Sequence, residues 1–399
     1  MSRADNPVKM LTFRRALMVA ALFLTIFYLT TRSTAPNSPP TPPPILKTDL
    51  DSPKQSSSTT ASPDQKTPDG KPAHSGAGVG RNRQNTASHG QQPMQDLSKM
   101  TLYEKLAYQY PYDVQSKFPA YIWQTWKWTP AHGEFNFREQ EATWTEQHPG
   151  FIHEVITDQV AVHLLRLLYA SVPEVLEAYE ALPLPVLKAD FFRYLILLAR
   201  GGIYSDIDTF AIRSALDWIP DKVPRDAIGL VIGIEADPDR PDWKDWYSRR
   251  IQFCQWTIQS KPGHPVLREV VTEITNETLK RKKAGSLKDI VDKNVIEFTG
   301  PALWTDIIFA YFNDARYFDM TRSAGPIDYK NFTGMEVSKR VGDVVVLPIT
   351  SFSPGVQQMG AKDYDDPMAF VKHDFEGECL FLCFGLLVFP TNSLRYLET

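Results

Sequence analysis

Two carboxylates that lie two residues apart, Asp206 and Asp208, are the side chains in this sequence best suited to bind a metal ion. They occur in the run from Tyr204 to Phe210, in which Tyr204, Ile207 and Phe210 are the apolar or aromatic neighbours. If this run is an extended strand, Tyr204, Asp206 and Asp208 share one face, because successive side chains alternate along a strand. Converging oxygen ligands favour a hard divalent cation such as Mn²⁺ or Mg²⁺, with substrate phosphates filling its other positions. An isolated Asp-x-Asp is also typical of solvated turns and caps, so the surrounding elements must decide.

A helix is predicted immediately before the carboxylates, from Pro183 and Pro185 to Gly201-Gly202. Its apolar residues recur at helical spacing and predict one buried stripe, made of Leu187, Phe191, Tyr194, Leu195 and Leu198. Asp190 and Arg193 are three residues apart and lie beside this stripe. One interpretation of the two is a surface ion pair of little energetic weight. The other is that they lie next to the carboxylates and contact a nucleotide.

Strands and helices alternate along the rest of the chain. A strand is predicted over 120–126, a helix over 158–169 and a buried strand over 227–235. This alternation predicts an α/β domain with a central, mostly parallel sheet. Ligands in such sheets bind beyond the carboxyl ends of the strands. Glu235 and Asp237, at the start of an acidic loop, are therefore candidates for binding hydroxyl groups, and a solvated loop is the alternative.

The order of these motifs resembles glycosyltransferase family 32. The resemblance rests on Ala189-Asp190 with Arg193-Tyr194, on the two glycines that follow, and on the Asp-x-Asp pair. It continues through 233–240, 249–257 and 263–265, and these segments look most like the fungal members that add α-1,6-linked mannose. The similarity covers about residues 101 to 375, and several separated motifs occur in the same order.

The resemblance implies a GT-A-like nucleotide-sugar-binding fold and a retaining transfer of mannose. The donor would be GDP-mannose, and the acceptor the 6-hydroxyl of a mannose on the core of an N-linked oligomannose glycoprotein. Asp206 and Asp208 would be the catalytic residues. They would hold Mn²⁺ (or Mg²⁺) together with His373, which opens a His-x-Phe-x-Gly motif. The residues expected to bind the nucleotide sugar are Gln124, Thr125, Asp190, Arg193, Tyr204, Glu235 and Asp237.

The chain departs from the family pattern after Gly377. The family continues with Ser-Trp-Lys, which helps to hold the donor phosphates, whereas this chain has Glu378-Cys379-Leu380 and then an apolar run. We hypothesise that residues 378–399 are an altered or mis-joined end. This departure favours an alternative function, a non-catalytic scaffold subunit of a Golgi mannosyltransferase complex. Asp206 and Asp208 favour catalysis instead, because a scaffold has no need of paired carboxylates.

Two further alternatives are enzymes. A member of the same family could use another sugar donor or a glycolipid acceptor, and the similarity over 235–257 argues against it. A metal-dependent phosphohydrolase also uses aspartates, but it would not be expected to carry the family motifs.

The first hundred residues predict a membrane anchor and a stem. A cytosolic tail over 1–15 carries basic residues, and residues 16–31 form an uncharged, mostly apolar run. Sixteen helical residues span roughly 24 Å, which suits the thin membranes of the early secretory pathway. The positive-inside rule then predicts a type II protein of the Golgi membrane with a luminal domain over 101–399. Residues 32–100 are rich in Pro, Ser and Thr and predict a disordered stem. A cleaved signal peptide is the alternative to the anchor.

Charge argues against a nucleic-acid partner. Residues 1–100 hold 12 Lys or Arg and 6 Asp or Glu, a net charge of +6, whereas the other 299 residues hold 31 and 41, a net charge of −10. A domain that binds nucleic acid would be expected to be basic. Cys254, Cys379 and Cys383 allow at most one disulfide. Asn276 and Asn331 lie in N-glycosylation sequons, which fit luminal exposure.

Overall fold

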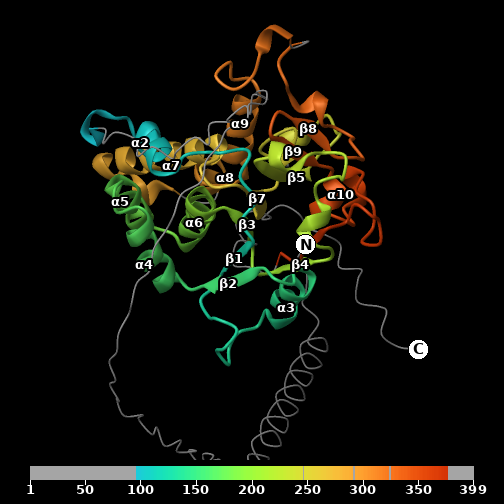
Figure 1. Ribbon diagram of the computed structural model, residues 1–399, viewed down its shortest axis with the longest axis horizontal. Helices are drawn as coiled ribbons and strands as arrows, with labels where there is room; N and C mark the ends of the chain where they lie inside the picture. The colour runs from blue at the N-terminus through green and yellow to red at the C-terminus, as the bar shows by residue number, and fades with distance from the viewer. Residues whose placement is uncertain (1–95, 246, 291–292, 323–324, 376–399) are drawn as a thin grey trace, which may run out of the picture. The chain divides into compact units, whose positions relative to one another are not determined.

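The computed structural model describes residues 96–245, 247–290, 293–322 and 325–375 (Figure 1). The predicted cytosolic tail, membrane anchor and nearly all of the predicted stem lie outside these residues. So do Cys379, Cys383 and the unusual end at 378–399. Within the part of the chain that is described, no helix is long and apolar enough to cross a membrane.

A mixed sheet of eight strands forms the centre of the described domain. Its order is β2-β1-β3-β7-β5-β9-β8, and β6 pairs with β5. The strands span Tyr121–Thr125 (β1), Ile152–Ile156 (β2), Gly202–Ser205 (β3), Leu230–Ala236 (β5), Gln252–Phe253 (β6), Thr257–Ser260 (β7), Lys339–Val341 (β8) and Val344–Leu347 (β9). A separate antiparallel pair joins β4 (Thr209–Ala211) to β10 (Val371–His373).

The direction of the strands largely agrees with the predicted parallel sheet. Strands β1, β2, β3, β5 and β9 run the same way. Strand β7 was not predicted, and it lies antiparallel between β3 and β5. It enters the sheet after the acidic loop and the short strand β6 have reversed the chain that left β5. The carboxyl ends of β1, β3 and β5 therefore remain at one edge of the sheet, where the predicted site residues lie.

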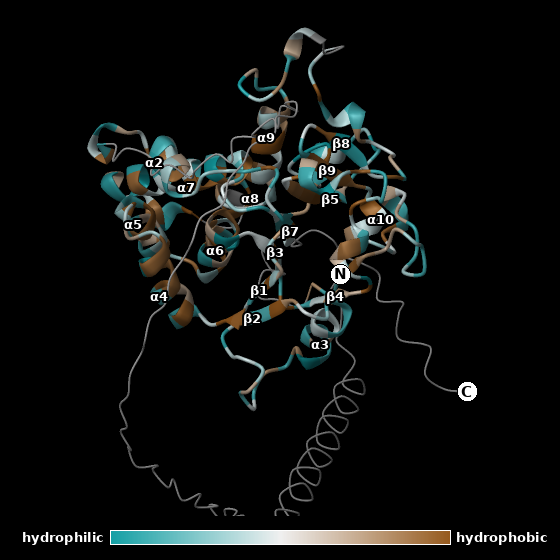
Figure 2. Cartoon of the chain, in the orientation of Figure 1, coloured by the Kyte–Doolittle hydropathy of each residue, from teal (hydrophilic) through white to brown (hydrophobic). Residues whose placement is uncertain are grey.

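Helices cover both faces of the sheet (Figure 1). They span Leu102–Gln109 (α2), Arg138–Gln147 (α3), Asp158–Leu168 (α4), Pro173–Ala181 (α5), Pro185–Arg200 (α6), Pro265–Ala284 (α7), Lys293–Phe298 (α8), Pro301–Phe312 (α9) and Ile349–Phe352 (α10). The alternation of side chains along β5 divides the core into two. Leu230 and Ile232 pack into the cluster formed by α6, α7 and α9, whereas Val231 packs on the other face with Phe352. Apolar colour in Figure 2 is correspondingly strong on α9.

Helix α6 begins and ends where the sequence predicts. Pro185 occupies its first turn, and Gly201 caps its end with φ of 63°. Gly202 follows with φ of 97°. A β-carbon on Gly201 would lie 2.8 Å from the carbonyl oxygen of Ser260, and one on Gly202 would lie 2.6 Å from that of Tyr121. Both positions therefore require glycine, because the backbone is left-handed and other backbone approaches it closely. All five residues of the predicted stripe are fully buried.

Candidate functional site

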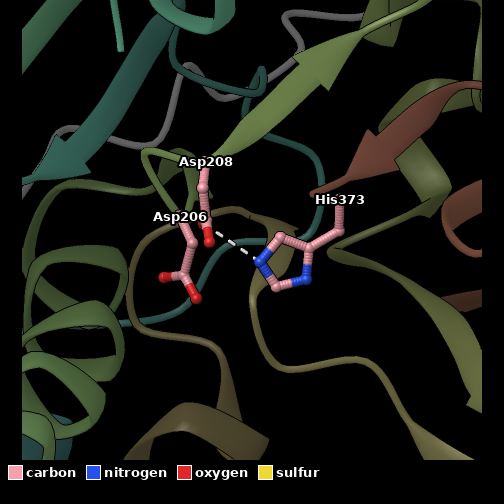
Figure 3. Close-up of side chains that lie close together, drawn as sticks. All are labelled: Asp206, Asp208 and His373. Atoms are coloured by element: carbon pink, nitrogen blue, oxygen red, sulfur yellow. Dashed lines mark hydrogen bonds and ion pairs between the residues drawn. The ribbon is translucent and has the colours of Figure 1, made fainter. Parts of the chain in front are cut away.

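Asp206, Asp208 and His373 come together at the end of β3 (Figure 3). Asp206 directly follows the strand, Asp208 lies in the turn between β3 and β4, and His373 is the last residue of β10. The register of the small sheet pairs His373 with Thr209, which brings the imidazole beside the carboxylates. One ligand atom from each of the three residues lies within 4.8 Å of the others. The predicted metal-binding residues are thus brought into one place.

The local backbone differs from the predicted strand. The strand was expected to continue from Tyr204 to Phe210, but it ends at Ser205, and a turn separates it from β4. Hydroxyl groups explain the break. Thr209 Oγ1 donates to the carbonyl oxygen of Asp206 at 2.6 Å, and Ser205 Oγ lies 2.8 Å from Thr209 Oγ1. Such side-chain bonds to nearby backbone compete with the ladder of a sheet. The carboxylates therefore converge through a turn and not through strand alternation.

Longer-range contacts hold the same turn. Trp144 Nε1 donates to both the carbonyl oxygen and Oγ1 of Thr209, at 3.1 and 3.0 Å. Thr257 Oγ1 lies 2.7 Å from Ser205 Oγ, which ties β7 to β3. The backbone amide of Asp206 donates to the carbonyl oxygen of Trp256 at 2.9 Å. Contacts from α3 and from β7 with the residue before it thus fix the positions of both carboxylates before any ligand binds.

Asp206 is oriented through one of its two oxygens. Oδ1 accepts hydrogen bonds from Arg193 Nη2 at 3.0 Å and from the Tyr204 hydroxyl at 2.9 Å. No residue in the described ranges donates to Oδ2, so this oxygen is available to a cation. Burial raises the pKa of Asp206; the Arg193 charge lowers it, and the nearby Asp208 carboxylate raises it further. A divalent cation would relieve the repulsion between the two carboxylates.

Asp190 and Arg193 form a buried ion pair, which excludes the surface interpretation. The side chains are both 4% exposed, and Arg193 Nη1 lies 2.5 Å from Asp190 Oδ1. Arg193 therefore bridges Asp190 and Asp206. Burial raises the pKa of Asp190 to about 6, against the lowering effect of Arg193. The pair lies next to the carboxylates as predicted, and its contact with a nucleotide stays a prediction.

Gln124 and Thr125, at the end of β1, support the site from the side. Gln124 is fully buried, donates from Nε2 to the carbonyl oxygen of Asp206 at 3.1 Å, and lies 2.8 Å from His153 Nε2 through its Oε1. Thr125 Oγ1 lies 3.1 Å from the Tyr204 hydroxyl. Gln124 thus positions the turn that carries the candidate metal ligands, and its contact with a nucleotide stays a prediction.

Glu235 and Asp237 differ in their surroundings. Glu235 is partly exposed; its oxygens accept from Gln252 Nε2 at 3.0 Å and from Trp256 Nε1 at 3.3 Å. Burial raises its pKa, and the hydrogen bond from Gln252 and the charge of His373 lower it. Trp256 also packs against His373, with the ring centroids 4.5 Å apart, so one side chain separates Glu235 from this candidate ligand. Asp237 is buried, and its two oxygens accept from Arg250 Nη1 and from the backbone amide of Gly334, both at 2.7 Å. Both of its oxygens are therefore already engaged.

The donor set around His373 fits a divalent cation. His373 Nε2 lies 3.0 Å from Asp208 Oδ1, and its ring packs against Trp256 with the ring centroids 4.5 Å apart. His373 Nδ1 is buried and has no hydrogen-bond partner among the described residues. The Asp208 side chain is 5% exposed and that of Asp206 24%. Two carboxylates and one imidazole are ligands that Mn²⁺ accepts, and its binding would require Nε2 to lose its proton.

Sequence reasoning missed the residues that surround these ligands. Gln255 and Thr299 bind Asp190, and Trp144 holds the turn. Gln255 falls in the segment 249–257 that resembles family 32, but the resemblance carried no role for it. One local signal was present, because the hydroxyl residues Ser205 and Thr209 flank the two aspartates and such residues favour turns.

Known proteins resemble both the site and the wider chain. Residues 135–224 match the family described as a glycosyltransferase sugar-binding region containing a DXD motif. The chain is 49% identical over 292 residues to an initiation-specific α-1,6-mannosyltransferase of Candida albicans, which covers 69% of this chain and 76% of that protein. A protein of the same name from Schizosaccharomyces pombe is 46% identical, covering 68% and 66%. A putative glycosyltransferase of Saccharomyces cerevisiae is 43% identical, covering 69% and 68%.

Proposed function

The chain belongs to the glycosyltransferase family that includes these initiation-specific α-1,6-mannosyltransferases, and on this premise we propose that it is one itself. It would move mannose from GDP-mannose to the core of an N-linked glycan, with retention of configuration, and so begin the outer chain. The observation that carries the proposal is the convergence of Asp206, Asp208 and His373 at the carboxyl end of β3, in a chain 49% identical to such an enzyme. The order of the sheet is compatible with a GT-A-like fold, which we include in the proposal.

The three metal-binding residues would act on the diphosphate of the donor. A bound Mn²⁺ or Mg²⁺ supplies charge neutralisation and Lewis acidity toward the leaving group. Asp206 would bind it through Oδ2, because Arg193 and Tyr204 already occupy Oδ1. Asp208 and His373 are more deeply buried than Asp206 and would fix the inner side of the cation. Mn²⁺ is favoured over Mg²⁺ because the set includes an imidazole nitrogen.

The remaining predicted residues would position the sugar and the nucleotide. Asp190 and Arg193 lie behind Asp206, so they would act on the donor at its diphosphate end. Glu235 is partly exposed and contacts Trp256, which packs against His373, so it is a candidate for accepting a hydrogen bond from a hydroxyl of the sugar. Preorganised groups of this kind lower the barrier by positioning and by stabilising charge, with no reorganisation during the reaction.

Localisation and topology form part of the proposal. We place the protein in the Golgi membrane as a type II protein, with residues 16–31 as the anchor and the catalytic domain in the lumen. Asn276 and Asn331 are both exposed in the structure, which is compatible with luminal glycosylation. Protease treatment of sealed vesicles would test the topology, since only a luminal domain would be protected.

A transfer assay tests the proposed reaction. The full chain in detergent would be incubated with GDP-mannose, Mn²⁺ and an oligomannose N-glycan, and the product examined by mass spectrometry and by digestion with a linkage-specific mannosidase. We expect the gain of one hexose in an α-1,6 linkage, and its loss with a chelator. Hexose gain from another sugar nucleotide, or onto a glycolipid alone, would replace the proposal with a different member of the family.

A non-catalytic scaffold subunit is the second candidate function. The change from Ser-Trp-Lys to Glu378-Cys379-Leu380 favours it. An Asp206→Asn exchange separates the two, because a scaffold would tolerate it in cells whereas a transferase would not. If turnover is absent in the folded chain, restoring Ser-Trp-Lys after Gly377 distinguishes an impaired enzyme from a scaffold.

A further inference from the structure

A buried group of polar side chains lies behind the carboxylates, and two of its members, Gln255 and Thr299, have no part in the proposed chemistry. Asp190 accepts three hydrogen bonds: from Arg193 Nη1 at 2.5 Å, from Gln255 Nε2 at 3.2 Å and from Thr299 Oγ1 at 2.8 Å. Arg193 and Gln255 share Oδ1, and Thr299 alone binds Oδ2. Thr299 is fully buried and Gln255 is 9% exposed, so water does not replace these donors. Gln255 and Thr299 thus supply two of the three side-chain hydrogen bonds that Asp190 accepts within the described residues.

Tyr194 fixes both neutral donors in place. Its hydroxyl donates to Gln255 Oε1 at 2.5 Å and also lies 3.1 Å from the carbonyl oxygen of Thr299. Tyr194 is fully buried and stacks on Trp304 with ring centroids 5.5 Å apart. Gln255 therefore turns its amide nitrogen, and not its oxygen, toward Asp190. The orientation of the group is set by the fold, because the segments before α9 and before β7 meet at α6 here.

The same group reaches the metal-binding carboxylate through Arg193. The guanidinium lies between two carboxylates, and its Nη2 binds Asp206 Oδ1 at 3.0 Å. A guanidinium presents its donors in a rigid fork, so a shift toward one carboxylate withdraws it from the other. Gln255 and Thr299 supply two of the hydrogen bonds to Asp190, so Arg193 needs to donate to it only through Nη1 and can bind Asp206 through Nη2. Without these two donors, we expect the guanidinium to shift toward Asp190 and to donate both nitrogens to it.

We propose that Gln255 and Thr299 are positioning residues that orient Asp206 toward the divalent cation, acting through Asp190 and Arg193. Groups that orient a metal ligand from behind usually change metal affinity by 10- to 100-fold when they are removed. Gln255 and Thr299 are one residue further from the ligand, so we expect about 3- to 10-fold. Withdrawal of the Arg193 charge would act in the opposite direction and tighten the binding of the cation. We expect the loss of orientation to dominate, because Asp206 would keep only the Tyr204 hydroxyl on its side chain.

The experiment measures Mn²⁺ binding to the full chain in detergent, in the absence of any sugar nucleotide. Thr299→Val removes the hydroxyl and keeps the shape, and we expect a dissociation constant about 3- to 10-fold higher than that of the wild type. Thr299→Ser keeps the hydroxyl and should restore the affinity to within about twofold. Thr275→Val is the matched control: Thr275 is fully buried on α7, and its Oγ1 has no hydrogen-bond partner in the described part of the chain. It should leave the affinity unchanged.

A second variant keeps the test independent of the folding of Thr299→Val, and a double-mutant cycle with Asp190→Asn tests the route of the effect. Near-ultraviolet circular dichroism shows whether Thr299→Val folds. If it does not, Gln255→Met replaces it in the test, and we expect the same rise of about 3- to 10-fold in the Mn²⁺ dissociation constant. If the effect passes through Asp190, Thr299→Val should add less than about twofold in an Asp190→Asn background. A full additional loss would overturn the proposed route.

The inference rests on the proposed function only for the cation, and the two can fail separately. A wild type that binds Mn²⁺ but transfers no mannose, even after Ser-Trp-Lys is restored behind Gly377, would overturn the proposed function and leave this inference standing. If folded Thr299→Val has an unchanged or lower dissociation constant for Mn²⁺, the inference is overturned, whatever the transfer assay shows. The absence of Mn²⁺ binding by the wild type would overturn it as well.

Discussion

The described part of the chain contains two pairs of aspartate and histidine that are largely shielded from solvent, and their surroundings differ. Asp208 lies 3.0 Å from His373 at the candidate metal site, with the second carboxylate of Asp206 beside it. Asp343, which precedes β9, lies 3.4 Å from His264 at the start of α7. The Asp343 pair has hydroxyl groups around it where the Asp208 pair has a further negative charge.

The hydroxyl donors reverse the effect of burial on the pKa of the second pair. Asp343 accepts hydrogen bonds from the hydroxyl groups of Tyr112 and Tyr311, the latter at 2.8 Å. Burial tends to raise the pKa of Asp343, but His264 and the two tyrosines outweigh it, and the pKa falls well below the usual range. At Asp206, burial has the largest effect and the Asp208 charge adds to it, and both raise the pKa. The lowering effects of Arg193 and Tyr204 are smaller, so the pKa of Asp206 is raised. Donors of the chain itself stabilise the charged form of Asp343, whereas the charged form of Asp206 is disfavoured until a cation binds.

The strongest test of this comparison is to remove one charge from each region. Asp206→Asn should abolish measurable Mn²⁺ binding and lower kcat by about 10³-fold, because the cation contributes several kcal/mol to the transition state. Asp343→Asn should leave kcat within about threefold when the variant is assayed under conditions in which it is folded. Mannose transfer and Mn²⁺ titration measure both variants. Loss of turnover in folded Asp343→Asn would show that the second pair also serves catalysis.

The free energy of unfolding should fall more in Asp343→Asn than in Asp206→Asn, which is the reverse of the order expected for kcat. Asp343→Asn leaves two buried tyrosine hydroxyl groups and His264 without a charged acceptor, and we expect it to lower the free energy of unfolding by about 2 to 4 kcal/mol. Asp206→Asn should change it by less than about 1 kcal/mol, since the charged form of Asp206 is already disfavoured by burial. Urea unfolding of the metal-free chains measures this difference. Equal losses would remove the distinction between the two regions.

The pH dependence of stability should have opposite signs for the two carboxylates. The pKa of Asp343 is lowered by folding, so its contribution is present above its unfolded pKa and is lost as the pH falls toward the folded value. The pKa of metal-free Asp206 is raised, so its contribution is greatest below its unfolded pKa and is lost as the pH rises through the folded value. Unfolding curves for wild type and both Asn variants, from pH 3 to 7 with a chelator, would measure this. The difference in unfolding free energy between wild type and variant should rise with pH for Asp343→Asn and fall with pH for Asp206→Asn. A change of the same sign for both would contradict this prediction.

The smallest expected difference comes from removing one hydroxyl in each region. Tyr311→Phe should lower the free energy of unfolding by about 1 kcal/mol, because Asp343 loses one donor. Tyr204→Phe should lower it by less, and should instead raise the Mn²⁺ dissociation constant by about 3- to 10-fold, because Asp206 loses one of its two orienting donors. Calorimetry with and without Mn²⁺ separates the two effects. A shift in metal affinity in Tyr311→Phe would contradict the comparison.

Local patterns and the family resemblance predicted which three residues converge, but not the geometry that brings them together. Asp206, Asp208 and the helix before them were identified because their signals lie within thirty residues. The turn at 206–208 was read as a strand, since a spacing of two residues fits both, and the hydroxyl bonds of Thr209 decided between them. Strand β7 and the roles of Gln255 and Thr299 depend on contacts between distant segments. No local periodicity encodes such contacts, so they could not be predicted.

The pairing of β10 with β4 has a consequence for the order in which the protein matures. His373 follows its partner Asp208 by 165 residues, so the ribosome must add that whole length before the third ligand exists. Synthesis proceeds at about 5 to 20 residues per second, which leaves roughly 8 to 33 seconds between the two. During this interval the nascent chain holds both carboxylates without their imidazole. The domain therefore acquires its complete set of candidate ligands only late in synthesis, and early release of the chain would yield a product that lacks His373.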